Sequence, residues 1–376
     1  MKVPARITLA LLALLTTLAV FAGTAAASPG GGHGSGRVVF ALTDNVAGNQ
    51  VVAYDRVGRG RLKAAGTYST GGSGGILAGS IVDHTASQGA LAYDAANNLL
   101  LAVNPGSNSV AVFRVSGDEL SLTQVIGSGG TFPVSIAARN NVVYVLNALN
   151  GGTVQGFGVN GDQLVPVAGS NRGLGLNPSA TPQFTTTPGQ VAFSPDGTHL
   201  IVTTKANSNS IDVFGVDAFG NLSATATVNA DPGAVPFAIS FTPTGNVVIA
   251  EAGTNALATF SLAANGTLSL LGRTPTGQAA TCWVASSGAY LFASNAGSGS
   301  ISRFSAGNSA PSLLGATATD AGTVDAAATP DGDFLYVQTG AQGNIDGYAI
   351  GSDGSLTPVG SVTVPGAAGG EGIVAL

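Results

Sequence analysis

The chain has 376 residues, of which 44% are hydrophobic and only 9% are charged, and its formal net charge at pH 7 is −6. The hydrophobic content argues against a disordered chain, and the 56 glycines indicate many tight turns. The acidic balance and the shortage of lysine exclude nucleic acid and anionic membrane surfaces as expected partners.

The first segment has the pattern of a secretory signal peptide, which we expect to occupy residues 1–27. Lys2 and Arg6 precede an apolar run, and three alanines end the segment. Residues 28–36 contain only serine, proline, glycine and one histidine, and we expect a Gly-rich flexible linker there. The loss of Lys2 and Arg6 would move the formal charge from −6 to −8. We expect residues 37–376 to be secreted, and no later apolar run predicts membrane insertion.

A repeat runs through residues 37–376. Apolar runs that end in Phe or Tyr and are followed by a turn recur seven times, and four of the six separations between these aromatic residues are 44 to 46 residues. A unit of this size that is built from short apolar runs fits four strands, which is one propeller blade. We therefore expect an all-β, seven-bladed β-propeller with four-stranded blades and almost no helix. The repeated aromatic residues are Tyr54, Phe113, Phe157, Phe214, Phe260, Phe304 and Tyr348.

One unit, residues 190–228, shows how the four strands follow one another. Ser-Pro-Asp-Gly at 194–197 separates the first two strands and is typical of a tight turn. The inner runs are nearly continuous in apolar or small residues, as expected for strands covered on both faces. The last run alternates and predicts a half-exposed outer strand. The four expected strands are Gln190–Phe193, Leu200–Thr204, Ile211–Val216 and Leu222–Val228.

The two ends of the repeat predict how the ring closes. The residues after the last repeated aromatic and those before the first together make one period. We therefore expect Glu371–Leu376 to be the innermost strand of a blade whose other three strands begin at Arg37, which hides strand edges. The two longer separations contain links between blades, Gly66–Gln88 and Ala168–Thr187, and we expect both to cap one side of the channel mouth.

Candidate site residues come from the face on which the links lie, because loops on a rigid scaffold vary freely. Glu251 and Lys205 take equivalent places in neighbouring units, where a catalytic pair and a structural ion pair are both open alternatives. His84 is the third catalytic candidate, since an imidazole titrates near neutral pH, and a loop histidine without a catalytic role is the alternative. The ligand-binding candidates are Gln190, Trp283, Asn295, Asp325 and Glu371.

We expect no cofactor and no dedicated metal site. The sequence contains no His-Glu-x-x-His pattern, and its single cysteine, Cys282, excludes an internal disulfide. A cation held between Asp325 and Glu371 stays open as an alternative, as does packing of Trp283 in the channel floor. We expect a monomer whose partner is a small-molecule ligand or an extracellular protein or glycan.

Three stretches resemble the lactonase family of seven-bladed propellers: Ser194–Gly197 and Thr329–Gly332, both with Pro-Asp-Gly, and SNAGSGSISRF at Ser294–Phe304. This family includes the bacterial 6-phosphogluconolactonase of propeller type and the fungal carboxymuconate-lactonizing enzymes. The resemblance covers nearly all of the repeat region and implies ring-opening or ring-closing chemistry on a lactone in the central channel. Histidines that the family carries before a middle-blade turn are replaced here by Pro-Gly-Gln-Val at 188–191. A phosphorylated sugar substrate is therefore not expected.

Two classes of function follow from these observations. One is an extracellular lactone hydrolase or isomerase that acts on an uncharged or weakly charged ring. In it, Glu251 or His84 activates water, and Lys205 with Asn295 stabilises the developing oxyanion. The other is a non-catalytic propeller that binds a protein, glycan or small ligand on its loop face.

Overall fold

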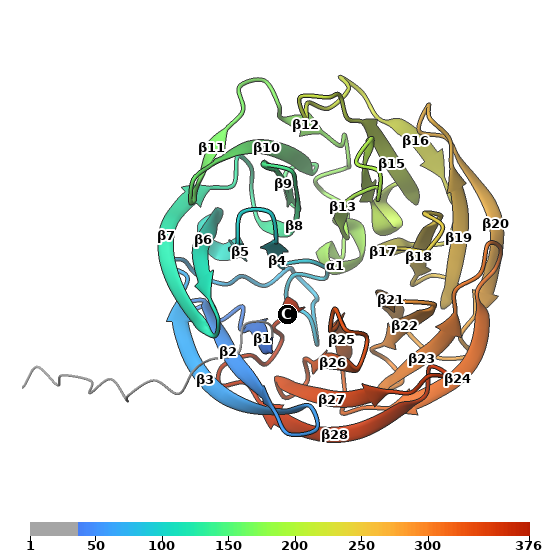
Figure 1. Ribbon diagram of the computed structural model, residues 1–376. Coiled ribbons are helices and arrows are strands. Elements are labelled where there is room, and N and C mark those ends of the chain that lie inside the picture. Colours follow the sequence, from blue (N-terminus) through green and yellow to red (C-terminus); the bar gives the residue numbers. More distant parts are fainter. Residues whose placement is uncertain (1–36) are drawn as a thin grey trace, which may run out of the picture. The chain divides into compact units, whose positions relative to one another are not determined.

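The computed structural model describes residues 37–376, which form a ring of seven antiparallel sheets (Figure 1). The expected signal peptide, 1–27, and linker, 28–36, lie outside the described residues. Helical segments in the described part are short: α1 (Gln183–Thr186) and two 3₁₀ turns, Pro105–Ser107 and Lys205–Asn207. None of these helices is long and apolar enough to span a membrane. The expected seven-bladed, nearly all-β architecture is confirmed.

Each blade contains four main strands, ordered from the channel outward. Blade one consists of β29 (Ile373–Ala375), β1 (Val38–Leu42), β2 (Gln50–Val57) and β3 (Arg61–Ser69). Blade two consists of β4 (Leu91–Asp94), β5 (Leu99–Asn104), β6 (Ser109–Ser116) and β7 (Glu119–Gly127). Blade three consists of β8 (Pro133–Arg139), β9 (Val142–Asn147), β10 (Thr153–Asn160) and β11 (Gln163–Pro166), with β12 (Arg172–Gly173) also paired to β10.

The other four blades follow the same order. Blade four consists of β13 (Val191–Phe193), β14 (His199–Thr203), β15 (Ser210–Gly215) and β16 (Thr227–Ala230). Blade five consists of β17 (Pro236–Phe241), β18 (Val247–Glu251), β19 (Ala256–Leu262) and β20 (Leu268–Pro275). Blade six consists of β21 (Thr281–Ser287), β22 (Tyr290–Asn295), β23 (Ser300–Ser305) and β24 (Ser312–Ala318). Blade seven consists of β25 (Thr323–Ala328), β26 (Phe334–Thr339), β27 (Asn344–Ile350) and β28 (Leu356–Thr363).

The C-terminal strand closes the ring as the repeat predicted. β29 pairs antiparallel with β1, with Phe40 opposite Val374. Leu42 N also donates to Gly372 O at 2.9 Å, which extends the pairing by one bond. The regular strand is shorter than the expected 371–376, because Gly372 has a φ of +114° and takes the chain out of the strand.

All seven repeated aromatic residues lie on the third strand of their blades and are buried. The pairing of strands three and four shifts by one residue next to this aromatic in blades one, two, five, six and seven. Such a bulge twists the outer strand and bends it over the ring beside the aromatic side chain. The period seen in the sequence is therefore the period of one recurring strand position.

The outer strand of blade four differs from its expected range. The sequence predicted Leu222–Val228, whereas β16 begins at Thr227 after one isolated bridge between Val216 and Leu222. The Ser223 hydroxyl accepts a hydrogen bond from Gly215 N at 3.1 Å, which takes the place of a regular strand partner. Local side-chain bonding of this kind competes with a sheet ladder, so alternation alone misplaced the strand.

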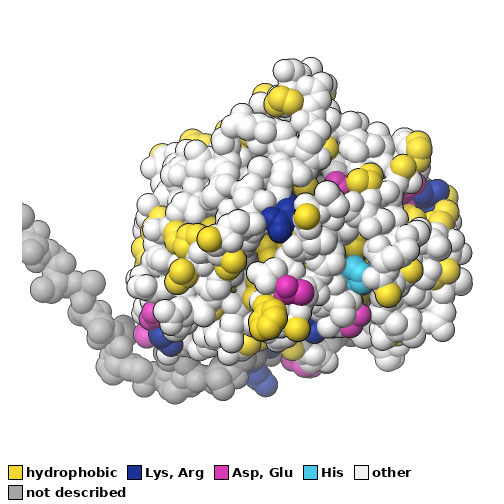
Figure 2. Space-filling view, turned by 90° about the horizontal axis from the view of Figure 1, so that it is seen from above, with side chains coloured by type: hydrophobic (Ala, Val, Ile, Leu, Met, Phe, Trp, Pro, Cys, Tyr) yellow, Lys and Arg dark blue, Asp and Glu magenta, His cyan; other side chains and the backbone are white. Residues whose placement is uncertain are grey.

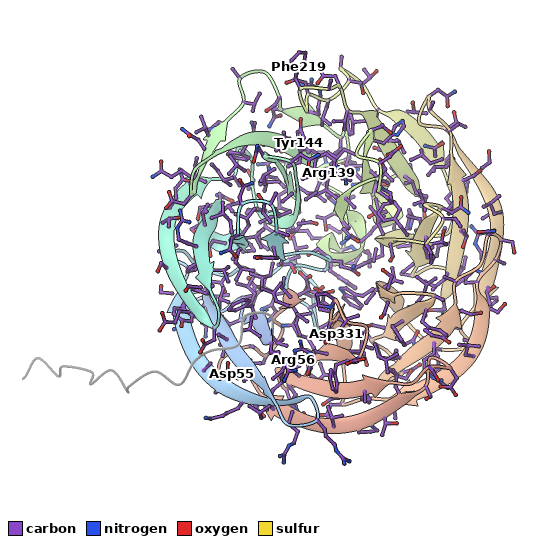
Figure 3. All side chains as sticks on the ribbon, viewed as in Figure 1. Asp55, Arg56, Arg139, Tyr144, Phe219 and Asp331 are labelled. Carbon is purple, nitrogen blue, oxygen red and sulfur yellow. The ribbon has the colours of Figure 1, made fainter. Side chains whose placement is uncertain are left out.

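The core lies between neighbouring blades, where the inner three strands are buried on both faces. All six residues of β5 are buried, for example, whereas β7 in the same blade alternates between covered and exposed positions. Side chains fill the ring between the sheets (Figure 3). The edge of the ring seen in Figure 2 carries isolated charged side chains among mostly uncharged surface, as the low charge content requires.

The ring has two faces with different loops. The link face carries the turns between strands two and three and the links between blades, and the turn face carries the other two sets of turns. The two long links meet on the link face, where Ala78 N donates to Gln183 Oε1 at 2.9 Å and Phe184 N to Ala78 O at 3.4 Å. The expectation that both links cap the same mouth is confirmed.

Candidate functional site

Residues 83–90, at the end of the link between β3 and β4, cross the centre of the ring at the link face (Figure 1). Ser87 Oγ donates to Val134 O in blade three, and the Trp283 indole of blade six donates to Ser87 O. The Gln88 amide bonds both the N–H and the C=O of Val284, also in blade six. The channel mouth is therefore spanned by the chain itself.

Glu371 anchors this crossing segment to blade one. Its carboxyl is buried and accepts bonds from Gly89 N at 2.8 Å and Ala90 N at 3.4 Å. It also lies 3.1 Å from Ser87 Oγ and 3.2 Å from Thr85 Oγ1, whose protons have nearer acceptors in Val134 O and Asp83. These groups surround the buried acid in place of water. Glu371 thus holds the crossing segment in place.

Asp325 lies beside Glu371 and forms an acid pair with it. A bulge between Thr323 and Ala326 in the first strand of blade seven places Asp325 inward, where it accepts from Ala326 N at 2.9 Å. Burial raises the pKa of Asp325 to about 7, and burial with repulsion from Asp325 and Asp83 raises the pKa of Glu371. Two buried acids this close share a proton near neutral pH, because ionising both is costly.

Lys205 is fully buried under the two long links. Its Nζ donates to Ala86 O at 2.6 Å, to Phe184 O at 2.8 Å and to Thr187 Oγ1 at 3.1 Å. Burial lowers the pKa of Lys205 to about 7. These three acceptors belong to both links, so Lys205 ties the links together and has no donor left for a substrate oxyanion.

Glu251 does not meet Lys205. Arg273 NH2 donates to Glu251 Oε1 at 2.8 Å and to Asp231 Oδ1 at 2.8 Å, and Thr254 Oγ1 also bonds Glu251. The structural ion pair, which was one of the two alternatives for this residue, is therefore the arrangement found. The expected rim pair of Lys205 and Glu251 does not form. The two residues are not equivalent, because the place of Glu251 is taken in blade four by Thr204, and Lys205 follows in a 3₁₀ turn. Each of them finds nearer partners.

The remaining ligand-binding candidates are also engaged within the protein. Trp283 packs edge-on against Phe237, with ring centroids 4.9 Å apart. Asn295 accepts from Thr281 Oγ1 and donates to Ser300 O at 3.1 Å. Gln190 Oε1 accepts from a backbone amide of blade five. These side chains join strands and blades, and their ligand roles stay predictions.

His84 is the catalytic candidate that keeps exposed surface, since 20% of its side chain is accessible. Its Nδ1 lies 3.4 Å from Oδ2 of Asp44, which is buried two residues after the end of β1. This is an ion-pair distance, and the two atoms are not aligned as a hydrogen bond. Contact with the Asp44 carboxylate raises the pKa of His84, and burial raises the pKa of Asp44 to about 6. A Cβ on Gly369 would lie 2.2 Å from His84 Nε2, so the imidazole fits here because residue 369 is glycine.

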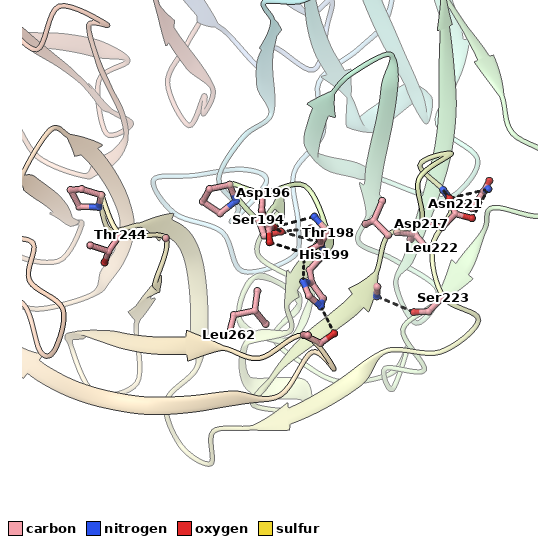
Figure 4. A pocket seen from close by; sticks show the side chains of 16 residues that line it. Ser194, Asp196, Thr198, His199, Asp217, Asn221, Leu222, Ser223, Thr244 and Leu262 are labelled. Carbon is pink, nitrogen blue, oxygen red and sulfur yellow. Dashed lines mark hydrogen bonds between the residues drawn. The ribbon is translucent and has the colours of Figure 1, made fainter.

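The turn face carries a separate cavity of about 1070 Å³ at the seam of blades four and five (Figure 4). Its polar groups bond within their own turns: Ser194 Oγ donates to Asp196, and Asn221 N donates to Asp217. The His199 ring is held between Thr198 Oγ1 at 2.9 Å and Ala264 O at 3.2 Å. The lining groups therefore stabilise turns.

No group of three or more His, Cys, Asp or Glu side chains within residues 37–376 has the arrangement of a metal site. Asp325 and Glu371 instead accept hydrogen bonds from backbone amides of the protein itself.

Cys282 is buried, and burial raises the pKa of its thiol to about 12.

Two features escaped the sequence reasoning. Asp44 is the partner of His84; it follows Thr43, which holds in blade one the position that Asn104 and Asn147 hold in blades two and three. The second is a cluster of arginines within 37–61, which is dense for a chain with so few charged residues.

Comparisons with known proteins agree with this fold. The family model described as "Lactonase, 7-bladed beta-propeller" matches residues 142–285 and 188–313. A search of curated proteins gave no match.

Similar solved structures cover most of the chain at low identity. A periplasmic gluconolactonase of Pseudomonas aeruginosa is 18% identical with a TM-score of 0.68, over 89% of this chain and 98% of its own. A Bacteroides uniformis protein, provisionally described as a 6-phosphogluconolactonase, is 19% identical with a TM-score of 0.70, over 88% and 97%. A Bacteroides fragilis protein with the same provisional description is 17% identical with a TM-score of 0.71, over 92% and 99%. Identities this low establish the fold alone.

Proposed function

We propose that the chain, a seven-bladed propeller that is similar to the lactonase family, hydrolyses a lactone with His84 on the link face as the general base. The observation that carries this proposal is the half-buried imidazole of His84 beside the buried carboxyl of Asp44, 3.4 Å away. A carboxylate beside Nδ1 stabilises the imidazolium electrostatically and leaves the other ring nitrogen to accept a proton. Among the three catalytic candidates, only His84 combines exposure with an uncommitted ring nitrogen.

The reaction requires one water and no other reactant. His84 Nε2 takes a proton as the water oxygen bonds to the lactone carbonyl carbon. The bond between that carbon and the ring oxygen then breaks, and the imidazolium returns its proton to the departing alkoxide. The product is an open-chain hydroxy acid. Asp44 is a positioning residue that stabilises the imidazolium between the two proton transfers.

The charges around His84 favour an uncharged lactone. Asp44 and Asp83 are buried beside His84 and interact with it electrostatically, so the acidic groups here are unfavourable to an anionic substrate. Lys205, the basic group of this region, is occupied by three acceptors. A phosphorylated sugar lactone would need a cationic cluster here, so an unphosphorylated sugar lactone is the better substrate class.

We also propose that the enzyme works outside the cell as a monomer. The first 27 residues carry the charged, apolar and small-residue succession of an export signal. The mass of the exported protein should correspond to a chain that begins near Ser28, whereas a retained Met1 would reject export by cleavage.

The test is hydrolysis of a panel of unphosphorylated sugar lactones by the wild-type protein, His84→Asn and His199→Asn. Loss of a general base costs roughly 10²–10⁴-fold in rate, which is expected for His84→Asn. His199 lies on the turn face and serves as the matched control, which should keep wild-type kcat. An inactive wild-type protein across the panel, or a His84→Asn variant with full kcat, would contradict the proposal.

A second function has one specific observation in its favour. Residues 83–90 span the channel mouth, and the protein's own groups occupy the acceptors and donors there. A propeller with a closed mouth suits binding of an extracellular protein, glycan or small ligand on the link face without turnover. A ligand that binds the wild-type protein and stays chemically intact would favour this function over the hydrolase.

A further inference from the structure

A groove of about 980 Å³ lies on the turn face, at the seam where blade one meets blade seven. The β2–β3 turn forms one side, and the turn between β25 and β26, with Asp331 and Asp333, forms another. Pro358 and Val359 of β28 complete the lining. The groove is independent of His84, which lies on the other face.

Four arginines line this groove: Arg37, Arg56, Arg59 and Arg61. Residues 37–376 contain eleven Lys and Arg side chains, and five of these lie between Arg37 and Lys63. The chain as a whole is acidic, so this concentration of positive charge runs against its composition. We call the four arginines and the surface between them the arginine groove.

Arg56 forms the fixed floor of the arginine groove. Only 6% of its side chain is exposed, and its NH1 lies 3.6 Å from Asp331 Oδ2 (Figure 3). Its NH2 donates to Leu376 O at 3.2 Å, and the guanidinium carbon lies 5.8 Å from the centre of the Phe334 ring. These contacts join the two blades and hold a cation in one orientation.

Arg37, Arg59 and Arg61 are exposed, and none of their guanidinium groups has an ion-pair partner among residues 37–376. Gly60, between two of them, packs against Phe334 so closely that a Cβ would lie 2.2 Å from the ring. The β2–β3 turn is therefore packed against blade seven, with Arg59 and Arg61 on either side of its glycine. Two exposed positive charges on one short turn attract an anion.

We propose that the arginine groove binds a carboxylate-bearing oligosaccharide. Guanidinium groups form bidentate bonds with carboxylates, and the groove offers three exposed guanidinium groups to a chain that carries several carboxylates. The exposed Pro358 and the partly exposed Val359 give apolar surface for the faces of sugar rings. Asp331 and Asp333 are exposed acceptors for sugar hydroxyls, which an anion-only site would not need.

The size of the groove and the charge of the protein support this class of ligand. About 980 Å³ is at the upper end of small-ligand sites, which suits several linked sugars better than one. The net acidity of the chain opposes nucleic acid, whose binding depends on long basic surfaces.

The test is titration calorimetry with a short oligogalacturonate and with a neutral maltooligosaccharide of equal length, both at low salt. The oligogalacturonate should bind the wild-type protein, and its affinity should fall as salt is added. The Arg59→Gln/Arg61→Gln double variant should weaken this binding by about tenfold, since each exposed charged contact contributes modestly. Arg114→Gln, an exposed arginine of blade two paired with Asp162, is the matched control and should bind as wild type.

Three results would overturn the proposal. These are the absence of oligogalacturonate binding, equal affinities for the charged and neutral sugars, and a double variant that binds as well as Arg114→Gln. Inorganic phosphate that binds the wild-type protein as tightly as the oligogalacturonate would likewise overturn it, because it would show an anion site without sugar recognition. His84→Asn should bind the oligogalacturonate unchanged, so failure of sugar binding and failure of the proposed hydrolase are separate outcomes.

Discussion

The link face and the turn face use their charged side chains in opposite ways. On the link face, Glu371 accepts from two backbone amides and Lys205 donates three hydrogen bonds, and both side chains are buried. On the turn face, Arg59 and Arg61 are exposed with no ion-pair partner among the described residues. Burying a charge requires full pairing, whereas an exposed charge costs little. Charged groups at the channel mouth therefore build the closure, whereas Arg59 and Arg61 on the turn face stay available for ligands.

Deletion of Glu371–Leu376 should have the largest effect, because it removes both the closing strand and the acid that anchors residues 83–90. Burial of a side chain as large as Ile373 contributes roughly 1.5–3 kcal/mol, and the buried acceptor adds to this loss. A domain is typically stable by only about 5–15 kcal/mol, so the truncated chain should aggregate or unfold at a much lower temperature. Thermal unfolding and soluble yield measure this effect, and an unchanged Tm would refute closure by β29.

The buried acids should make stability fall as pH rises. The pKa of Asp325 is about 7 in the folded protein and about 4 when unfolded. The folded state therefore holds the extra proton between these values, so its contribution is complete below about pH 4 and is lost by about pH 7. Asp325→Asn removes this titration and should flatten the decline in unfolding free energy by about 1.4 kcal/mol per pH unit.

Denaturant unfolding across this pH range measures the slope. Asp353→Asn, at an exposed aspartate of the turn face, is the control and should follow the wild-type curve. Parallel curves for Asp325→Asn and the wild-type protein would mean that Asp325 titrates normally.

A methyl group added next to Val82, just before the crossing segment, should destabilise the protein by about 1–3 kcal/mol, the usual range for overpacking. A Cβ on Gly340 would lie 1.7 Å from the carbonyl oxygen of Val82, so Gly340→Ala must displace the link. Gly158→Ala is the matched control, since nothing lies within 4 Å of its Cβ. Equal stabilities of the two variants in denaturant would show that the link packs loosely.

The smallest effect is expected on the turn face at Phe219, whose side chain is 86% exposed at the edge of the ring (Figure 3). Phe219→Ser removes little buried area and should change the unfolding free energy by less than about 0.5 kcal/mol. A large drop in Tm for this variant would contradict the view that the turns of this face tolerate change.

The sequence predicted the blades well because their signals are local and repeat. The spacing of residues such as Tyr54 and Phe113 marks one strand position, and the chain ends complete one period. The sequence prediction failed at the outer strand of blade four. There the Ser223 hydroxyl accepts the hydrogen bond of Gly215 N that a backbone carbonyl would accept in a regular strand pair. A side-chain bond of this kind leaves the alternating pattern unchanged, so the pattern cannot reveal it.

The site was predicted less well. The repeat indicates where along a blade a residue lies, but not which side chain of another blade or link it bonds. Val247 and Leu200 lie opposite the repeated aromatic residues of their blades, so the place of Glu251 is taken in blade four by Thr204 and not by Lys205. Arg273 and the long links then decide what Glu251 and Lys205 bond. His84 was recognised by its chemistry, whereas its pairing with Asp44 depends on how the link folds back.

The sequence by itself determined the number of blades, their closure and the face that carries the links, because these follow from a period that each unit expresses independently. Only the tertiary structure decided that residues 83–90 close the channel, that Asp325 and Glu371 share a buried site, and that the arginines of blade one face blade seven. Each of these contacts joins residues far apart in the chain. Their formation depends on burial and on competing hydrogen bonds, neither of which a local sequence pattern records.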